Sequence, residues 1–98
     1  GQLSYSATKA AMIGITKTMA LELARFKINV NAIAPGFIAT EMVEQIADPV
    51  RKSITDTIPL RRFGEVREVA ALASFLLSTQ ADEVPANADF VIDGGLTV

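Results

Sequence analysis

The sequence predicts an α/β fold in which helices alternate with short strands. Apolar residues recur at helical spacing in three stretches, two β-rich runs separate or follow these stretches, and Pro or Gly stands at several of the borders. Half of the 98 residues are hydrophobic and a fifth are charged, which suits a buried sheet better than a disordered tail. We expect the order helix, strand, helices, strand, with parallel strands and a right-handed crossover connection.

The composition excludes several classes of site. The net charge is −2 and no basic cluster is present to neutralise phosphates, so we expect no nucleic-acid partner. The chain has no cysteine and no histidine, which excludes a disulfide, a thiolate nucleophile, an imidazole base and a zinc site. The apolar runs are too short or too interrupted to span a bilayer, and the start lacks the layout of a signal peptide, so we expect no membrane contact.

The first element is a helix predicted from Ser4 to about Arg25. A Ser suits the start of a helix as a cap, and Arg25 and Lys27 lie near the end, where the helix dipole favours cations. Two of its faces are apolar, one of small residues and one of larger ones: Ala7, Ala10, Ala11 and Gly14, then Met12, Ile15 and Met19. We expect both faces to be buried, one by the sheet and one by another helix.

A strand follows, predicted from Ile28 to Ala34, where apolar residues alternate with Asn29 and Asn31. Pro35 and Gly36 end it. After this turn, we expect a short helix, a break, and a second short helix.

Asp48 and Pro49 are predicted as the N-cap and first-turn residues of that second helix. Val50, Ile54 and Ile58 lie along one of its sides, and Pro59 ends it. A third helix is predicted over residues 65–78, and a last strand within residues 88–95, which close on a pair of glycines.

Tyr5 and Lys9 are a candidate chemical pair because residues four apart share one face of a helix. A nearby ammonium favours the phenolate form of a tyrosine, so such a pair can supply a proton near neutral pH. The same spacing occurs by chance in many helices, so the pair alone does not identify a site. The second candidate is the loop from Pro35 to Thr40, because ligands of open α/β sheets bind beyond the carboxyl ends of strands. Its alternative is an ordinary loop with a Pro-Gly turn.

Three stretches together resemble the short-chain dehydrogenase/reductase family: YSATKAA at residues 5–11, VNAIAPG at 30–36 and IDGG at 92–95. Gly1-Gln2, PGFIATEM and IPLRRFG are most similar to 3-oxoacyl-[acyl-carrier-protein] reductases and acetoacetyl-CoA reductases. The resemblance implies the C-terminal part of a Rossmann-like, doubly wound parallel sheet. It also implies a cytoplasmic oxidoreductase of fatty acid biosynthesis that transfers hydride between NAD(P)H and a carbonyl, here a 3-oxoacyl thioester.

The resemblance also implies roles for six residues. Tyr5 would protonate the carbonyl oxygen, and Lys9 would support Tyr5 and bind the nicotinamide ribose. Pro35, Gly36 and Ile38 would line the nicotinamide, with the Ile38 backbone facing its carboxamide. Thr40 would reach toward the carboxamide or the pyrophosphate. Residues 41–57 would form a mobile cover over the substrate.

The chain also departs from the family pattern. No glycine-rich loop is present to hold the dinucleotide phosphates, and the family's catalytic Ser and Asn would precede Gly1. The chain starts with Gly1 and not with Met. We therefore expect residues 1–98 to be the C-terminal portion of a single reductase domain whose N-terminal, nucleotide-binding part is absent. The choice between NADP and NAD lies in that part, although the resemblance favours NADP.

Two other interpretations stay open. In the first, the chain is a non-catalytic fragment or a scaffold piece whose apolar helix faces pair with another chain. In the second, it belongs to another short-chain sugar or alcohol dehydrogenase. The resemblance implies a homo-oligomer that associates through the helix from Ser4 to Arg25.

Overall fold

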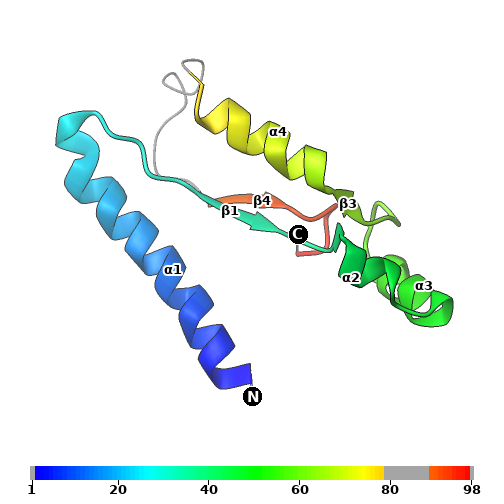
Figure 1. Cartoon of the computed structure of the whole chain (residues 1–98). Coiled ribbons are helices and arrows are strands. Elements are labelled where there is room, and N and C mark those ends of the chain that lie inside the picture. The colour runs from blue at the N-terminus through cyan, green and yellow to red at the C-terminus, as the bar shows by residue number, and fades with distance from the viewer. Residues whose placement is uncertain (1, 79–88, 98) are drawn as a thin grey trace. The chain divides into compact units, whose positions relative to one another are not determined.

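The computed structural model of the chain describes residues 2–78 and 89–97 (Figure 1). Its elements in chain order are α1 (Gln2–Leu23), η1 (Ala24–Phe26), β1 (Ala32–Pro35), β2 (Ile38–Ala39), α2 (Glu41–Glu44), α3 (Asp48–Thr57), β3 (Gly64–Glu65), α4 (Val66–Leu76) and β4 (Asp89–Ile92). The predicted α/β class is confirmed. The chain divides into two compact units, which are described one at a time. The first unit is Gly1–Ala32 with Leu76–Phe90, and the second is Ile33–Phe75 with Val91–Val98.

In the first unit, α1 begins at Gln2, two residues before the predicted start. Ser4 is therefore inside the helix and does not cap it, and its carbonyl accepts a hydrogen bond of 2.7 Å from the Thr8 hydroxyl. The helix tightens into η1 and ends at Lys27, whose φ of 59° is left-handed. The Lys27 and Ile28 N–H groups donate to the carbonyls of Ala24 and Leu23, which closes the helix end.

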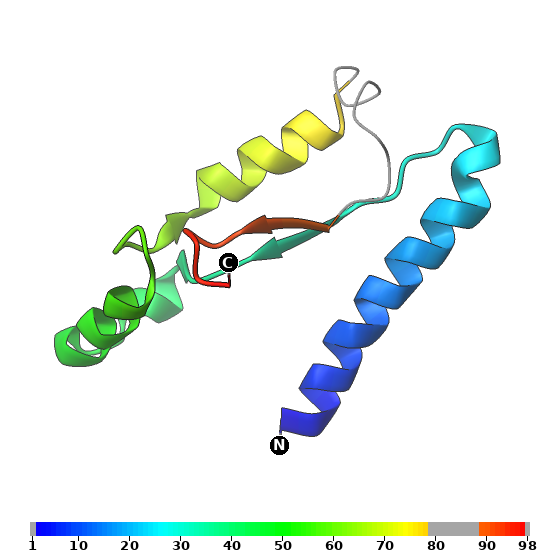
Figure 2. The same ribbon diagram turned by 180° about the vertical axis from the view of Figure 1, so that it is seen from behind.

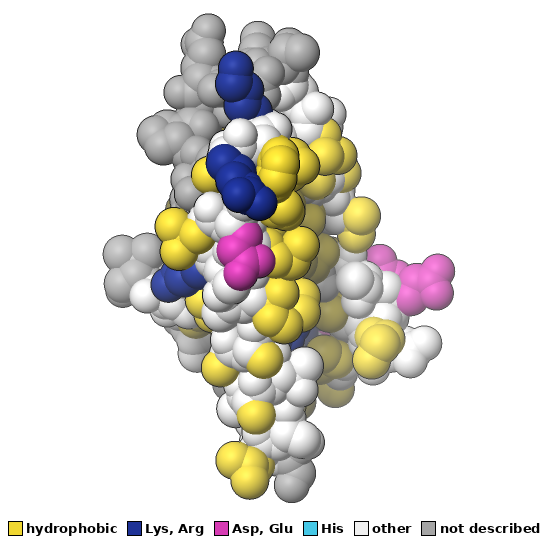
Figure 3. All heavy atoms as spheres, turned by 90° about the vertical axis from the view of Figure 1, so that its left-hand side faces the viewer, with side chains coloured by type: hydrophobic (Ala, Val, Ile, Leu, Met, Phe, Trp, Pro, Cys, Tyr) yellow, Lys and Arg dark blue, Asp and Glu magenta, His cyan; other side chains and the backbone are white. Residues whose placement is uncertain are grey.

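Both apolar faces of α1 are largely exposed within the described residues, contrary to the prediction. Ala20 is buried, whereas Met12, Ile15 and Met19 are between 43% and 59% exposed. Figure 3 shows hydrophobic side chains gathered on the face that it presents. The physical reason is one of size, because strands of four residues such as β1 and β4 are too short to cover a helix of 22 residues on two sides.

β1 and β4 pair with one another, and their arrows point the same way in Figures 1 and 2. β1 begins at Ala32, four residues after the predicted start. A strand needs a partner for its ladder, and the described part of β4 supplies only four residues. β1 ends at Pro35, one residue after the predicted end at Ala34, and the next N–H, that of Gly36, donates to the Ile92 carbonyl at 2.9 Å.

In the second unit, β2 and β3 form a parallel pair that the sequence analysis missed. Ile38 lies opposite Gly64, and Ala39 lies opposite Glu65. Two residues are too few to show the alternation that identifies a strand in a sequence. Phe37 and Phe63, just before the two strands, contact each other edge to face with ring centroids 6.2 Å apart.

The predicted short helix, break and second helix are α2 and α3. Ala47 is the N-cap of α3, so the assignment of this role to Asp48 was wrong. The extended backbone at Ala47 leaves Asp48 as the first helical residue, and Pro49 fits the first turn as predicted. The Arg51 guanidinium donates to the Val43 carbonyl at 2.9 Å and so ties α3 to α2. Ile58 follows α3, is 2% exposed, and precedes Pro59, which agrees with the predicted end.

α4 spans Val66–Leu76, within the predicted range of 65–78, because Glu65 belongs to β3. β4 starts at Asp89, and Ala88 of the predicted strand lies outside the described residues. Among the described residues, none of the helices combines the length and apolar character needed to cross a membrane. In that same part of the chain, His, Cys, Asp and Glu side chains form no cluster of three or more that would hold a metal ion.

Candidate active site

Tyr5 and Lys9 lie together on α1, as predicted from their spacing. The Lys9 ammonium nitrogen lies over the Tyr5 ring, 5.4 Å from its centroid. Tyr5 is 64% exposed, so the phenol is accessible to a ligand within the described structure. The arrangement places an accessible phenol hydroxyl and a positive charge on the same face of α1.

Four predicted site residues lie at and after the carboxyl end of β1 in the second unit: Pro35, Gly36, Ile38 and Thr40. Pro35 and Thr40 are exposed, whereas Gly36 and Ile38 are half-buried. Thr40 occupies the N-cap position of α2, and its carbonyl accepts the Val43 and Glu44 N–H groups at 3.0 and 3.1 Å. Its hydroxyl makes no capping hydrogen bond, contrary to what a capping residue usually does.

The Ile38 backbone is directed by its pairing with β3. The N–H of Gly64 donates to the Phe37 carbonyl at 2.8 Å, so the N–H and C=O groups of Gly64 point toward β2. In a parallel ladder, the residue opposite such a partner points its own N–H and C=O to the other side. The Ile38 amide therefore points away from β3, on the side where a further hydrogen-bonding partner would bind.

Gly36 has a packing role that the sequence analysis did not predict. A Cβ atom at this position would lie 2.6 Å from the Asp93 Cβ and 2.9 Å from the Asp93 Cα. Only glycine allows β1 to end this close to the residue that follows β4. The predicted lining of a cofactor by Gly36 stays a prediction.

Asp93 orders the glycine pair that closes the chain. Its carboxylate accepts hydrogen bonds from the Gly95 N–H at 3.0 Å and from the Thr97 N–H and hydroxyl at 3.1 and 2.6 Å. The Thr97 hydroxyl is the largest cause of the lowered pKa of Asp93. Gly94 and Gly95 have φ values of 67° and 92°, which favour glycine. The closing IDGG stretch is thus a carboxylate-organised turn.

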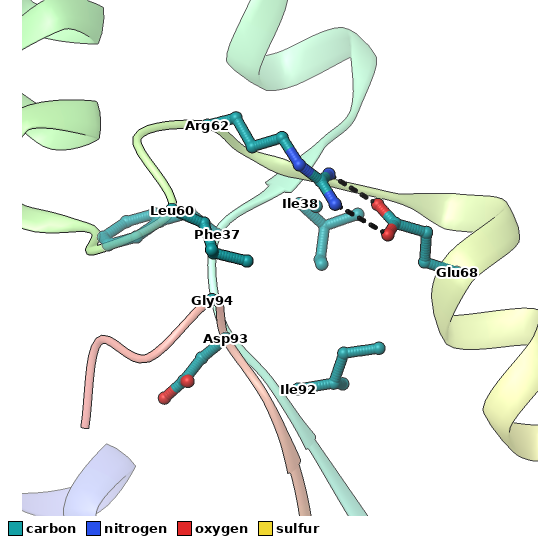
Figure 4. A pocket seen from close by; sticks show the side chains of 9 residues that line it. Phe37, Ile38, Leu60, Arg62, Glu68, Ile92, Asp93 and Gly94 are labelled. Atoms are coloured by element: carbon teal, nitrogen blue, oxygen red, sulfur yellow. Dashed lines mark hydrogen bonds and ion pairs between the residues drawn. The ribbon is translucent and has the colours of Figure 1, made fainter. Parts of the chain in front are cut away.

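A cavity of about 90 Å³ lies beside Ile38 in the second unit (Figure 4). Its lining comes from three stretches of chain: Phe37 and Ile38; Leu60, Arg62, Gly64 and Glu68; and Ile92, Asp93 and Gly94. Figure 4 shows the Asp93 carboxylate pointing away from the Arg62–Glu68 pair. Sequence reasoning missed Arg62 and Glu68, although the charge-rich RRFGEVRE stretch was a visible signal.

Arg62 and Glu68 form a bidentate ion pair at the edge of this cavity. The two terminal guanidinium nitrogens donate to the two carboxylate oxygens at 2.7 and 2.9 Å. The hydrogen bond from Arg62, followed by one from the Glu65 N–H, lowers the pKa of Glu68 to about 2. Glu68 therefore carries its charge throughout the physiological range.

The six predicted site residues are divided between the two units. Tyr5 and Lys9 belong to the first unit, and the four residues beyond β1 belong to the second. The roles assigned to both groups stay predictions. Their assembly into one site belongs to the proposal below.

Comparison of the sequence with models of known protein families identifies the family of this chain. A family model described as enoyl-(acyl carrier protein) reductase matches residues 1–97. The chain belongs to the short-chain dehydrogenase/reductase family. The three stretches that resembled this family are thus correctly interpreted, and the Rossmann-like assignment agrees with the solved relatives.

Two curated relatives of this short-chain dehydrogenase/reductase chain show how much of the family it spans. The 3-oxoacyl-[acyl-carrier-protein] reductase FabG of Thermotoga maritima is 47% identical over 98 residues, which cover all of this chain and 39% of that protein. The acetoacetyl-CoA reductase of a Synechocystis strain is 52% identical over 81 residues, which cover 83% of this chain and 34% of that protein. The chain thus spans between a third and two fifths of these relatives.

Solved structures agree with this assignment. A 4-hydroxyisoleucine dehydrogenase mutant complexed with NADH and succinate has a TM-score of 0.85 and 37% identity, over 95% of this chain and 39% of that one. An Escherichia coli K-12 protein described as an oxidoreductase has a TM-score of 0.77 and 41% identity, over 96% of this chain and 34% of its own.

Proposed function

We propose that this chain supplies the proton donor and the nicotinamide end of the active site in an NAD(P)-dependent reductase of 3-oxoacyl thioesters. The observation that carries the proposal is the Lys9 ammonium over the Tyr5 ring, within the YSATK stretch of a short-chain dehydrogenase/reductase chain. The names of the curated relatives support the thioester substrate.

Tyr5 acts as the general acid. A bound nicotinamide cofactor supplies hydride to the carbonyl carbon, and the Tyr5 hydroxyl donates its proton to the carbonyl oxygen. Lys9 stabilises the resulting phenolate by its charge and binds the nicotinamide ribose. A positioned general acid contributes about 10²–10⁴-fold to a rate, which is the contribution expected of Tyr5.

The residues beyond β1 fit the nicotinamide end of such a cofactor. The Ile38 amide points away from β3 and offers both a donor and an acceptor to a carboxamide. The exposed Thr40 hydroxyl makes no capping bond and has donor and acceptor capacity for the same group or for the pyrophosphate. Pro35 and Gly36 supply the wall at the strand end. These four positions bind and orient the cofactor.

α2 and α3 cover the substrate in this proposal. Met42 and Val50 are 80% and 53% exposed, so the pair of helices offers apolar surface to an acyl chain. The Arg51 bond to the Val43 carbonyl connects the two helices. Closure over the thioester excludes water from the reacting carbonyl.

We also propose a homo-oligomer that associates through α1, with NADP as the favoured cofactor. Exposed apolar side chains along both faces of α1 support the association. The same surface supports the alternative of a non-catalytic scaffold piece. Turnover separates the two functions, because a scaffold piece needs no proton donor.

The test exchanges the matching segment of the Thermotoga maritima relative for these 98 residues, since that protein aligns with the whole chain. We call the product the exchanged reductase. It should oxidise NADPH or NADH in the presence of an acetoacetyl thioester, whereas the 98-residue chain alone should not, because it lacks a phosphate-binding loop. An exchanged reductase that melts cooperatively like its host and gives no turnover would contradict the proposal.

A further inference from the structure

The Glu68 carboxylate of α4 binds two residues of the stretch that precedes it, Arg62 and Glu65. Besides its two bonds to Arg62, it accepts the Glu65 N–H at 2.9 Å. Arg62 in turn donates to the Phe63 carbonyl at 3.1 Å. Residues 62–65 are therefore fixed to the first turn of α4 by charge-assisted hydrogen bonds, which are stronger than neutral ones.

The stretch held in this way is the one that pairs with β2. Gly64 donates to the Phe37 carbonyl, and the Phe37 and Phe63 rings contact each other edge to face. The Ile38 side chain packs over Gly64, where a Cβ atom would lie 2.8 Å from the Ile38 Cδ1. The place of Ile38 thus depends on the place of residues 62–65.

The cavity brings the ion pair and Ile38 together. Arg62, Glu68 and Ile38 all line it, and Figure 4 shows the Ile38 side chain beside the pair. A cavity of about 90 Å³ leaves Ile38 without full packing on this side. The neighbouring ion pair is a restraint on β3 at this point, beside the ladder to β2.

We propose that the Arg62–Glu68 pair is a positioning pair that sets the Ile38 backbone for the nicotinamide carboxamide. This inference rests on the proposed function, because it concerns the same site. Neither side chain touches substrate or cofactor in the proposal. Both act through β3, and breaking the pair lets β3 and Ile38 shift within the space of the cavity.

The chain offers a matched control in the Arg67–Glu65 pair. This pair lies in the same stretch but is more exposed, with side chains 82% and 51% exposed, against 52% and 33% for Arg62 and Glu68. Arg67 bonds through one nitrogen and does not line the cavity. A lone exposed pair of this kind contributes little.

The experiment compares Arg62→Gln, Arg62→Lys and Arg67→Gln in the exchanged reductase. Two ligands are titrated: the dinucleotide that the enzyme uses and the corresponding ADP-ribose, which lacks the nicotinamide. Arg62→Gln should raise the Kd of the dinucleotide about tenfold, as expected when the hydrogen bond from the Ile38 backbone to the carboxamide is lost, and the Kd of the ADP-ribose less than about twofold. Arg62→Lys keeps the positive charge but cannot make the bidentate contact with Glu68. Its Kd for the dinucleotide should lie between those of the unsubstituted protein and Arg62→Gln. Arg67→Gln should change neither constant by more than about twofold.

The outcomes separate this inference from the proposed function. Equal weakening of both ligands by Arg62→Gln, or no weakening of either, would overturn the positioning role. Should Arg62→Gln melt before it can be titrated, the Arg62→Lys titration decides by the same comparison. An unsubstituted exchanged reductase that binds no dinucleotide would instead overturn the proposed function, and this inference with it.

Discussion

Replacing Gly36 by alanine tests the packing between the ends of β1 and β4. The added Cβ would lie 2.6 Å from the Asp93 Cβ and 2.9 Å from its Cα, whereas ordinary contacts of such atoms begin at 3.4 Å. The obstacle includes backbone, so relief requires one strand end to move by nearly 1 Å. Overpacking of this kind costs about 1–3 kcal/mol, and we expect the upper end because no flexible side chain can give way.

The assay is the thermal unfolding of the exchanged reductase without cofactor. A loss of about 3 kcal/mol corresponds to a fall in Tm of about 6–12 °C for a domain of 150–250 residues. Gly64→Ala is the matched control, because its Cβ would lie 2.8 Å from the mobile end of the Ile38 side chain, which can rotate. It should cost clearly less. A Gly36→Ala protein with an unchanged Tm would refute the packing argument, and cofactor lining alone would then explain Gly36.

Three further predictions concern the exchanged reductase. Lys9→Ala should both raise the Kd of the dinucleotide and lower kcat, measured by fluorescence titration and steady-state kinetics, and a change in neither would contradict its double role. Gly14→Ala adds a Cβ that meets nothing within 4 Å in the described residues, so it should shift sedimentation toward smaller species only where a second copy packs closely on α1. Because the pKa of Glu68 falls from 4.5 to about 2 on folding, its stabilising effect should be present above pH 4.5 and be lost toward pH 2. If Tm fell with pH by the same amount in Glu68→Gln as in the unsubstituted protein, the result would contradict this.

The sequence predicted the elements that repeat over several turns or residues. α1, α3 and α4 have apolar residues at helical spacing. Pro59 follows the end of α3 as predicted, and β1 ends within one residue of the predicted position. The end of α1 was harder, because Lys27 adopts the left-handed conformation that glycine usually supplies. The strand predicted from Ile28 was too long, because β1 begins only at Ala32.

The site was predictable only in part. The proximity of Lys9 to Tyr5 was predictable because the four-residue spacing on one helix alone determines it. The Arg62–Glu68 pair depends on how β3 meets α4 and on a bidentate geometry, and neither leaves a periodic signal. The close approach of Gly36 to Asp93 joins residues 57 apart in the chain, so only the fold reveals it.

The central claim is that Tyr5 donates the proton, and single-turnover kinetics of Tyr5→Phe in the exchanged reductase test it most directly. Phenylalanine keeps the ring under the Lys9 ammonium and removes only the hydroxyl. The account predicts that hydride transfer to an acetoacetyl thioester slows by about 10²–10⁴-fold, while the Kd of the dinucleotide changes little. A Tyr5→Phe enzyme that keeps the full rate of this step would contradict the claim.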